Sequence, residues 1–144
     1  IMPLQYEQDI SICQDFSNIL SGIDSNLDIK LIDKKCSISD FYSIIKESKA
    51  LIAMRFHAII CGLMSNVELF GISYDPKVEI LLKQCNGCYI KTSEWRENKL
   101  YDKYNDWSNK AKTGLTYRID FFKNVELARQ NLEKIVKLLN ECSD

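Results

Sequence analysis

The sequence predicts a layered α/β domain built around a parallel sheet. Segments whose apolar residues recur at helical spacing alternate with short runs rich in β-forming residues, which is typical of strand–helix–strand units. A length of 144 residues suits one domain, and a hydrophobic fraction of 46% is enough for a core. We therefore expect a single domain over residues 1–144.

The N-terminal part is expected to hold the end of a strand, a helix and a second strand. Residues 1–5 have the composition of the last residues of a strand whose beginning is absent, which predicts the C-terminal part of a longer protein. Residues 7–20 have apolar side chains at helical spacing, and Gly22 is a stop signal. Residues 27–33 alternate apolar and polar side chains, as a half-buried strand near a sheet edge does.

The middle of the chain is expected to form the centre of the domain. Residues 39–49 predict a helix with Ser39 as its N-cap. Residues 50–54 are wholly apolar, as in a strand buried on both faces of a parallel sheet. The pattern then predicts a helix over 56–64, a central strand over 67–73, a helix over 76–84 that begins with Pro76, and a strand over 88–92.

The last third of the chain is expected to be largely helical. Residues 94–109 are polar with interleaved aromatic residues, and we expect helix in part of this segment. Residues 121–140 predict an amphipathic helix that closes the fold. Its apolar stripe is interpreted as a packing surface and consists of Val125, Ala128, Leu132, Ile135, Val136 and Leu139.

Composition narrows the possible partners and location. A net charge of -1 gives no electrostatic case for a nucleic-acid or membrane partner, so a small ligand is expected. No apolar run reaches the roughly 18 residues of a membrane span, and no signal peptide is visible. Six scattered cysteines indicate free thiols in a reducing compartment. We predict a cytoplasmic protein without an integral membrane segment.

Cys85 and Cys88 allow two interpretations. Their spacing matches half a zinc site or a redox pair, but no second paired motif supplies further ligands. Alternatively, the intervening Asn-Gly closes a helix, with the glycine adopting positive φ. The five glycines never cluster as a phosphate-binding or dinucleotide-binding loop, and we expect neither a cofactor nor a metal.

Candidate functional residues follow the two central strands. Arg55 and His57 come directly after the first strand, where a helix begins, and Tyr74, Asp75 and Lys77 follow the second. Ligands bind at the carboxyl ends of parallel strands, where helix N-termini and an arginine fork favour phosphate or carboxylate. His57 could then act as a general acid. The structural alternative is that Arg55 and His57 only satisfy carbonyl groups and that Asp-Pro only starts a helix.

The residues at these two positions resemble one family. Residues 54–60, Met-Arg-Phe-His-Ala-Ile-Ile, and residues 71–78, Gly-Ile-Ser-Tyr-Asp-Pro-Lys-Val, look like the C-terminal half of the polysaccharide pyruvyl transferases. Residues 2–6 together with Asp9 resemble the stretch that follows the first strand of that half, so the resemblance extends to about residue 92. Phe56 stands where the family usually has leucine.

The resemblance implies a fold and a reaction. The architecture would be similar to the GT-B glycosyltransferases, with an active site between two Rossmann-like halves, and this chain would be one three-layer half that lacks its N-terminal partner domain. Family members transfer the enolpyruvyl carbons of phosphoenolpyruvate onto two hydroxyl groups of a sugar, giving a ketal on a cell-surface polysaccharide or its precursor. This implies a cytoplasmic location, with the inner face of the membrane as an alternative.

The resemblance also assigns roles to individual residues. His57 would be the catalytic acid or phosphate partner and Arg55 the anion clamp, while Tyr74 and Lys77 would bind substrate. Trp95 and Trp107 either stack on a sugar ring or pack onto the domain. Without the other half, the chain alone is expected to be inactive. Two other functions stay open: a non-catalytic anion-binding or interaction domain, and half of a nucleotide-sugar glycosyltransferase.

Overall fold

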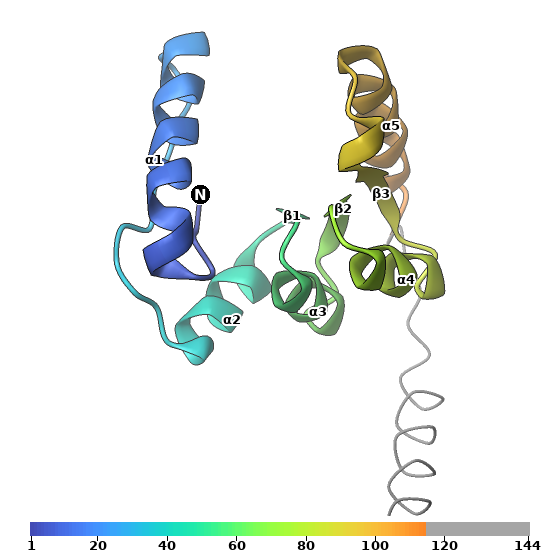
Figure 1. Ribbon diagram of the computed structural model, residues 1–144, viewed down its shortest axis with the longest axis horizontal. Helices are drawn as coiled ribbons and strands as arrows, with labels where there is room; N and C mark the ends of the chain where they lie inside the picture. The colour runs from blue at the N-terminus through green and yellow to red at the C-terminus, as the bar shows by residue number, and fades with distance from the viewer. Residues whose placement is uncertain (115–144) are drawn as a thin grey trace, which may run out of the picture.

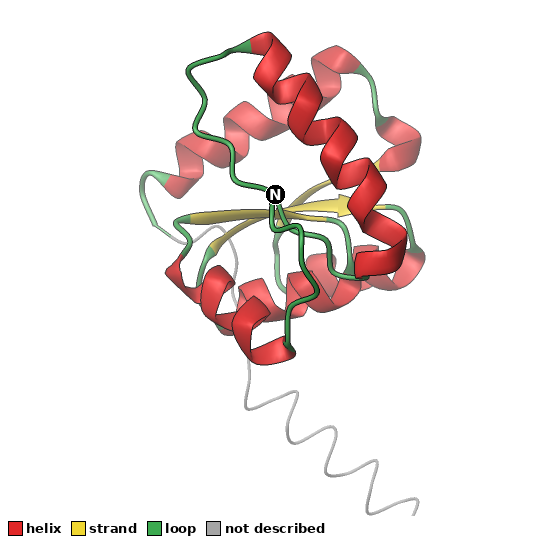
Figure 2. Cartoon of the chain, turned by 90° about the vertical axis from the view of Figure 1, so that its left-hand side faces the viewer, coloured by secondary structure: helices red, strands yellow, loops and turns green. Residues whose placement is uncertain are grey.

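A computed structural model describes residues 1–114, and the predicted helix over 121–140 lies outside them. The described part is an α/β Rossmann-like domain, as predicted. Its sheet has three parallel strands in the order β1-β2-β3, which are Ala50–Ala53, Glu68–Ser73 and Cys88–Lys91. Helices cover the sheet on both sides and make three layers (Figures 1 and 2).

One side of the sheet, here called the closed face, is covered by three helices. These are α2 (Ile38–Glu47), α3 (Phe56–Met64) and α4 (Pro76–Gln84). The packing is close: a Cβ atom added to Gly71 of β2 would lie 2.4 Å from Leu82 Cδ1 of α4. The main core lies here and includes Phe41, Ile45, Ile59, Leu63, Leu69, Val78 and Leu82.

Two successive strand–helix units on this side are built alike. Helices α3 and α4 each have nine residues, and their first residues are twenty positions apart. Each is followed by an asparagine with positive φ, 53° at Asn66 and 52° at Asn86, before the next strand begins. Asparagine tolerates this left-handed conformation better than most residues do. The helix-end interpretation of residues 85–88 is therefore confirmed, although Asn86 rather than Gly87 has positive φ.

The other side of the sheet carries α1 (Tyr6–Ile23) and α5 (Glu97–Ala111), the latter preceded by a 3₁₀ turn at Thr92–Glu94. Helix α5 lies in the segment expected to be partly helical. It buries Trp107 against Phe70 of β2, with ring centroids 5.5 Å apart, so this tryptophan packs onto the domain, while Trp95 is exposed. Helix α1 has no buried residue.

Four predictions about elements were wrong. Residues 1–5, predicted as the end of a strand, form no strand. Residues 27–33 form no strand: Ile1 donates a backbone hydrogen bond to Lys30 (2.8 Å) and accepts one from Ile32 (3.0 Å), and this pairing goes no further. Pro3 follows closely and has no N–H to extend the ladder. Helix α2 is capped by Ser37, two residues earlier than the predicted Ser39, through a capping box with Asp40. Strand β1 is not buried on both faces, because Ala50 and Ile52 are exposed.

Candidate anion-binding site

The predicted site residues lie at one edge of the sheet. Ala53 of β1 pairs with Gly71 of β2 in parallel register, so the residues that follow these strands come out side by side. Arg55 is the N-cap of α3 and Asp75 is the N-cap of α4. The topology therefore brings the two motifs together, as the sequence predicted from adjacent parallel strands.

Arg55 is held by an acidic partner and lies near Tyr74. Its Nη2 donates a hydrogen bond to Asp9 Oδ1 at the start of α1, and the two side chains are partly buried. The hydrogen bond to Asp9 raises the pKa of Arg55 against the opposing effect of burial, and the neighbouring Tyr74 hydroxyl raises that pKa further. Because a guanidinium has five N–H donors, others stay available for a ligand.

Asp9 is the residue that sequence reasoning missed as a partner of Arg55. Burial would raise the pKa of Asp9, but hydrogen bonds from Arg55 and from the backbone N–H of Gln5 outweigh it and lower that pKa below its usual value. Asp9 therefore stays a carboxylate that fixes the arginine. The two residues are 46 positions apart, and only the topology of the sheet brings them into contact.

The N-terminal ends of α3 and α4 differ. Asp75 Oδ1 accepts a hydrogen bond from the backbone N–H of Lys77 at 2.8 Å, so a carboxylate already occupies the start of α4. The N-cap residue of α3, Arg55, makes no such side-chain bond. The first backbone N–H groups of α3 therefore point into a region that already holds a cation, which favours an anion.

His57 occupies the second position of this uncapped helix. Its ring is exposed and meets Phe56 edge-on, with centroids 5.8 Å apart. Within residues 1–114 no side-chain hydrogen bond or ion pair occupies the imidazole, which leaves it free to meet a ligand. Lys77 approaches from the neighbouring helix, with its Nζ 6.0 Å from the centre of the Phe56 ring.

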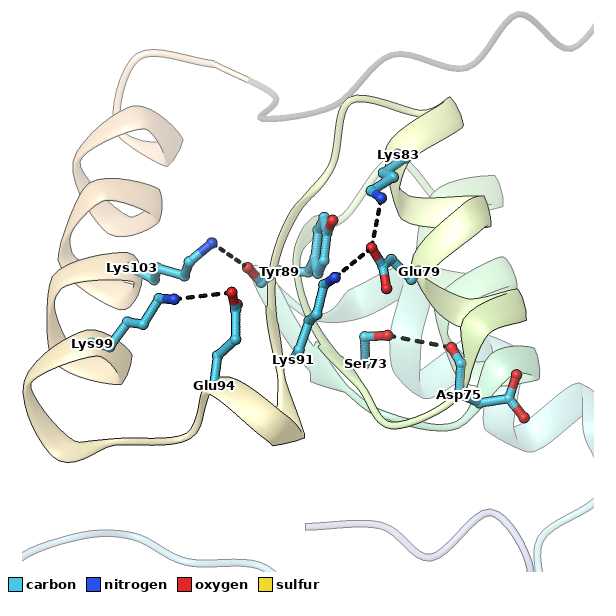
Figure 3. A network of polar contacts seen from close by, with 9 residues as sticks. All are labelled: Ser73, Asp75, Glu79, Lys83, Tyr89, Lys91, Glu94, Lys99 and Lys103. Carbon is cyan, nitrogen blue, oxygen red and sulfur yellow. Dashed lines mark hydrogen bonds and ion pairs between the residues drawn. The ribbon is translucent and has the colours of Figure 1, made fainter.

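Three lysines of α4, β3 and α5 are engaged elsewhere. Lys91 at the end of β3 shares Glu79 with Lys83, at 2.8 Å and 2.6 Å, and Lys103 donates to the backbone oxygen of Tyr89 (Figure 3). Within residues 1–114 the ion pair of Lys77 is a long one, with Asp75 at 3.9 Å, and the lysine side chain is exposed. Among these described lysines, Lys77 is thus the one best able to turn toward a ligand.

Cys85 and Cys88 lie apart from this site. Burial raises the pKa of both thiols, which disfavours the reactive thiolate. Within residues 1–114 no three side chains of metal-binding type come together, and every helix there is too short or too polar to cross a bilayer.

A comparison with protein families decides the affiliation of the chain. The family described as polysaccharide pyruvyl transferase matches residues 1–76, which is more than half of the sequence. The chain belongs to this family. No curated protein and no solved structure gave a significant match.

The family match covers most of the predicted site. Arg55, His57 and Tyr74 lie inside the matched residues, whereas Lys77 lies one position beyond them. Asp9 lies inside the match as well. In this pyruvyl transferase family member, the residues matched to the family thus include the arginine, its carboxylate partner and the single histidine of the chain.

Proposed function

We propose that this chain forms one wall of a phosphoenolpyruvate site in a polysaccharide pyruvyl transferase. The observation that carries the proposal is the pairing of Arg55 with Asp9 beside the uncapped N-terminus of α3, whose second residue is His57. A fixed guanidinium and free backbone N–H groups suit a phosphate or carboxylate. Phosphoenolpyruvate carries both groups.

The reaction requires an acid next to an anion site. A proton added to the methylene carbon of phosphoenolpyruvate leaves a cation-like centre at the adjacent carbon. One sugar hydroxyl attacks that carbon and loses its proton. The bond from the same carbon to the phosphate oxygen then breaks, and inorganic phosphate leaves with the electron pair. A second hydroxyl attacks the carbon, loses its proton and closes the ketal, so that of the two protons released one replaces the proton given to the methylene carbon and the other is taken up by phosphate or water. In this proposal His57 supplies the first proton, Arg55 binds the anionic groups, and Tyr74 and Lys77 complete the wall.

The proposal extends to the architecture of the enzyme. The chain would be the C-terminal Rossmann-like half of a GT-B-like, two-domain protein in the cytoplasm or at the inner face of the membrane, and a preceding half would supply the opposite wall of the cleft. The acceptor saccharide would contact that half and exposed residues such as Trp95. Phosphoenolpyruvate turnover by this chain alone is not expected.

Ligand-induced stabilisation of the full-length protein tests the donor. Phosphoenolpyruvate should raise the melting temperature more than UDP-glucose does, because a ligand that binds only the folded state stabilises it. Arg55→Ala should abolish the rise, while Arg96→Ala, which removes an exposed arginine before α5, should keep it. A larger rise with UDP-glucose would instead favour a nucleotide-sugar glycosyltransferase, and no rise with either would favour a non-catalytic domain.

Turnover tests the role of His57. His57→Gln keeps a polar side chain of similar size but cannot donate an acidic proton, so ketal formation should fall by about 10²-fold or more. The melting temperature should stay near that of the wild type, because the histidine is exposed. Turnover at the wild-type rate would exclude His57 as the acid.

A further inference from the structure

The side of the sheet that carries α1 and α5 is incompletely covered within residues 1–114. Ile52 of β1 and Phe70 of β2 are neighbours in the strand register and face the same side. Phe70 is 2% exposed because Tyr104 and Trp107 of α5 lie over it, whereas Ile52 is 55% exposed and Met54 is 45% exposed. Helix α5 therefore covers β2 on this side of the sheet but leaves the adjacent strand β1 exposed.

Helix α1 contributes an exposed apolar stripe to the same region. The stripe residues follow one another at spacings of four, three and four and are between 51% and 74% exposed. Asp9 precedes the stripe on the same helix face and contacts Arg55 just past β1, while Glu7, on the opposite side of α1, pairs with Lys35. The Asp9–Arg55 contact places the start of α1 beside the end of β1. The stripe continues along the helix from there and consists of Ile12, Phe16, Ile19 and Ile23.

We propose that residues 121–140 of the same chain cover this surface, called here the open face and defined by Ile52, Met54 and the α1 stripe. Five apolar residues of that segment, beginning at Val125 and ending at Leu139, recur at spacings of three, four, three and four. Two helices with such seams interlock side chain by side chain. The segment therefore offers an apolar partner for the α1 stripe, which has none within the described residues.

The lengths are compatible with this placement. The α1 stripe spans about 16 Å and the seam from Val125 to Leu139 about 21 Å, at the rise of an α-helix. The described chain ends at Gly114, shortly after α5, and the residues from there to Phe121 can reach about 25 Å when extended. A helix placed beside α5 is displaced by only about 8–10 Å.

A buried donor on this side of the sheet supports the presence of an additional covering segment. The indole N–H of Trp107 is buried and has no acceptor within residues 1–114. Buried donors normally have partners, so an acceptor from a covering segment would satisfy it. A segment of the same chain also acts at an effective concentration that a second copy reaches only at about millimolar levels.

The consequence for the molecule is a fixed position of α1. Within residues 1–114 this helix is held by polar contacts such as the Asp9–Arg55 pair rather than by buried side chains. Burial of its stripe would hold Asp9 in place beside Arg55. The inference concerns the fold and stands whether or not the chain binds phosphoenolpyruvate.

Hydrogen exchange of the full-length protein tests the proposal, with analytical ultracentrifugation as a measure of assembly. Leu132→Gln/Ile135→Gln should speed exchange about tenfold or more in peptides of β1 and α1, with no such change in α3 and α4. The matched control Lys134→Gln/Lys137→Gln places the same residues on the other side of the predicted helix and should exchange like the wild type. If the double variant also loses protection in α3 and α4, the milder Leu132→Ala variant gives the decisive comparison.

Two results would overturn the proposal. One is unchanged hydrogen exchange of β1 and α1 in the Leu132→Gln/Ile135→Gln variant, which would mean that residues 121–140 lie elsewhere. The other is protection of the open face that appears only with dimer formation at rising protein concentration, which would assign the face to a second copy. The proposal is supported if the monomer shows protection of β1 and α1 that is lost in the Leu132→Gln/Ile135→Gln variant and kept in the Lys134→Gln/Lys137→Gln control.

Discussion

The two faces of the sheet differ in how their strands are covered. On the closed face three helices pack so tightly that Gly71 has no room for a side chain, and Ile59 is fully buried. On the other face α5 covers β2 and β3, but Ile52 of β1 stays exposed. The wholly apolar β1, predicted as a central strand, is an edge strand of the described sheet. The comparison shows that apolar composition predicts a strand without showing its place in the sheet or which of its faces is covered.

A matched pair of substitutions should give the largest difference between the faces. Ile59→Ala leaves a cavity in the closed face and should lower the free energy of unfolding by about 2–5 kcal/mol. Both substitutions are made in the Leu132→Gln/Ile135→Gln background, which removes the proposed cover of the open face. Relative to that background, Ile52→Ala should lower the free energy of unfolding by about 1 kcal/mol or less. Denaturant titration measures both. Equal costs in that background would contradict the contrast between the two faces.

The open side should instead depend on polar contacts of α1. Asp9→Asn removes the charge that pairs with Arg55 and should lower the free energy of unfolding by roughly 1–2 kcal/mol near neutral pH. Because the pKa of Asp9 is lowered in the folded state, its contribution is full above the ordinary carboxyl range and is lost as the pH falls.

The difference between wild type and Asp9→Asn should therefore close below about pH 4, as measured by denaturant titration across pH. Asp15→Asn, at an exposed aspartate of the same helix, serves as the control and should change stability little at any pH. A constant difference between wild type and Asp9→Asn at every pH would refute the assignment to an ionised carboxylate.

The smallest expected effect concerns the N-cap of α2, the first of the three helices on the closed face. Ser37→Ala removes the cap of α2 and should lower the free energy of unfolding by about 1 kcal/mol, whereas Ser39→Ala, two residues later, should change it little. Thermal unfolding of the two variants makes the comparison. A larger loss for Ser39→Ala would restore the cap that the sequence pattern predicted.

The sequence was informative where local pattern and topology agree. Helices α3 and α4 begin and end where predicted, because a buried apolar face, Pro76 and a terminal asparagine mark them locally. The meeting of Arg55, His57 and Tyr74 at one edge also followed from two adjacent parallel strands. These features depend on contacts between neighbouring elements.

The predictions that were wrong depended on partners distant in the chain. The alternation in residues 27–33 predicts a strand, yet a strand needs a ladder of hydrogen bonds. Among the described residues, Ile1 alone forms backbone hydrogen bonds with this segment from a distant part of the chain. The apolar composition of β1 cannot show that Ile52 lacks a cover within residues 1–114. Likewise, nothing in the spacing of Asp9 and Arg55 indicates their contact, because the fold creates it.

The equal build of the two strand–helix units has one more consequence. His57 and Lys77 occupy the same position, the second residue, in helices that begin twenty residues apart. Neighbouring helices on one side of a sheet lie about 10 Å apart, so the backbone sets the pitch between these two nitrogen-bearing side chains. In the proposed site, this spacing would limit the length of a ligand that contacts both side chains.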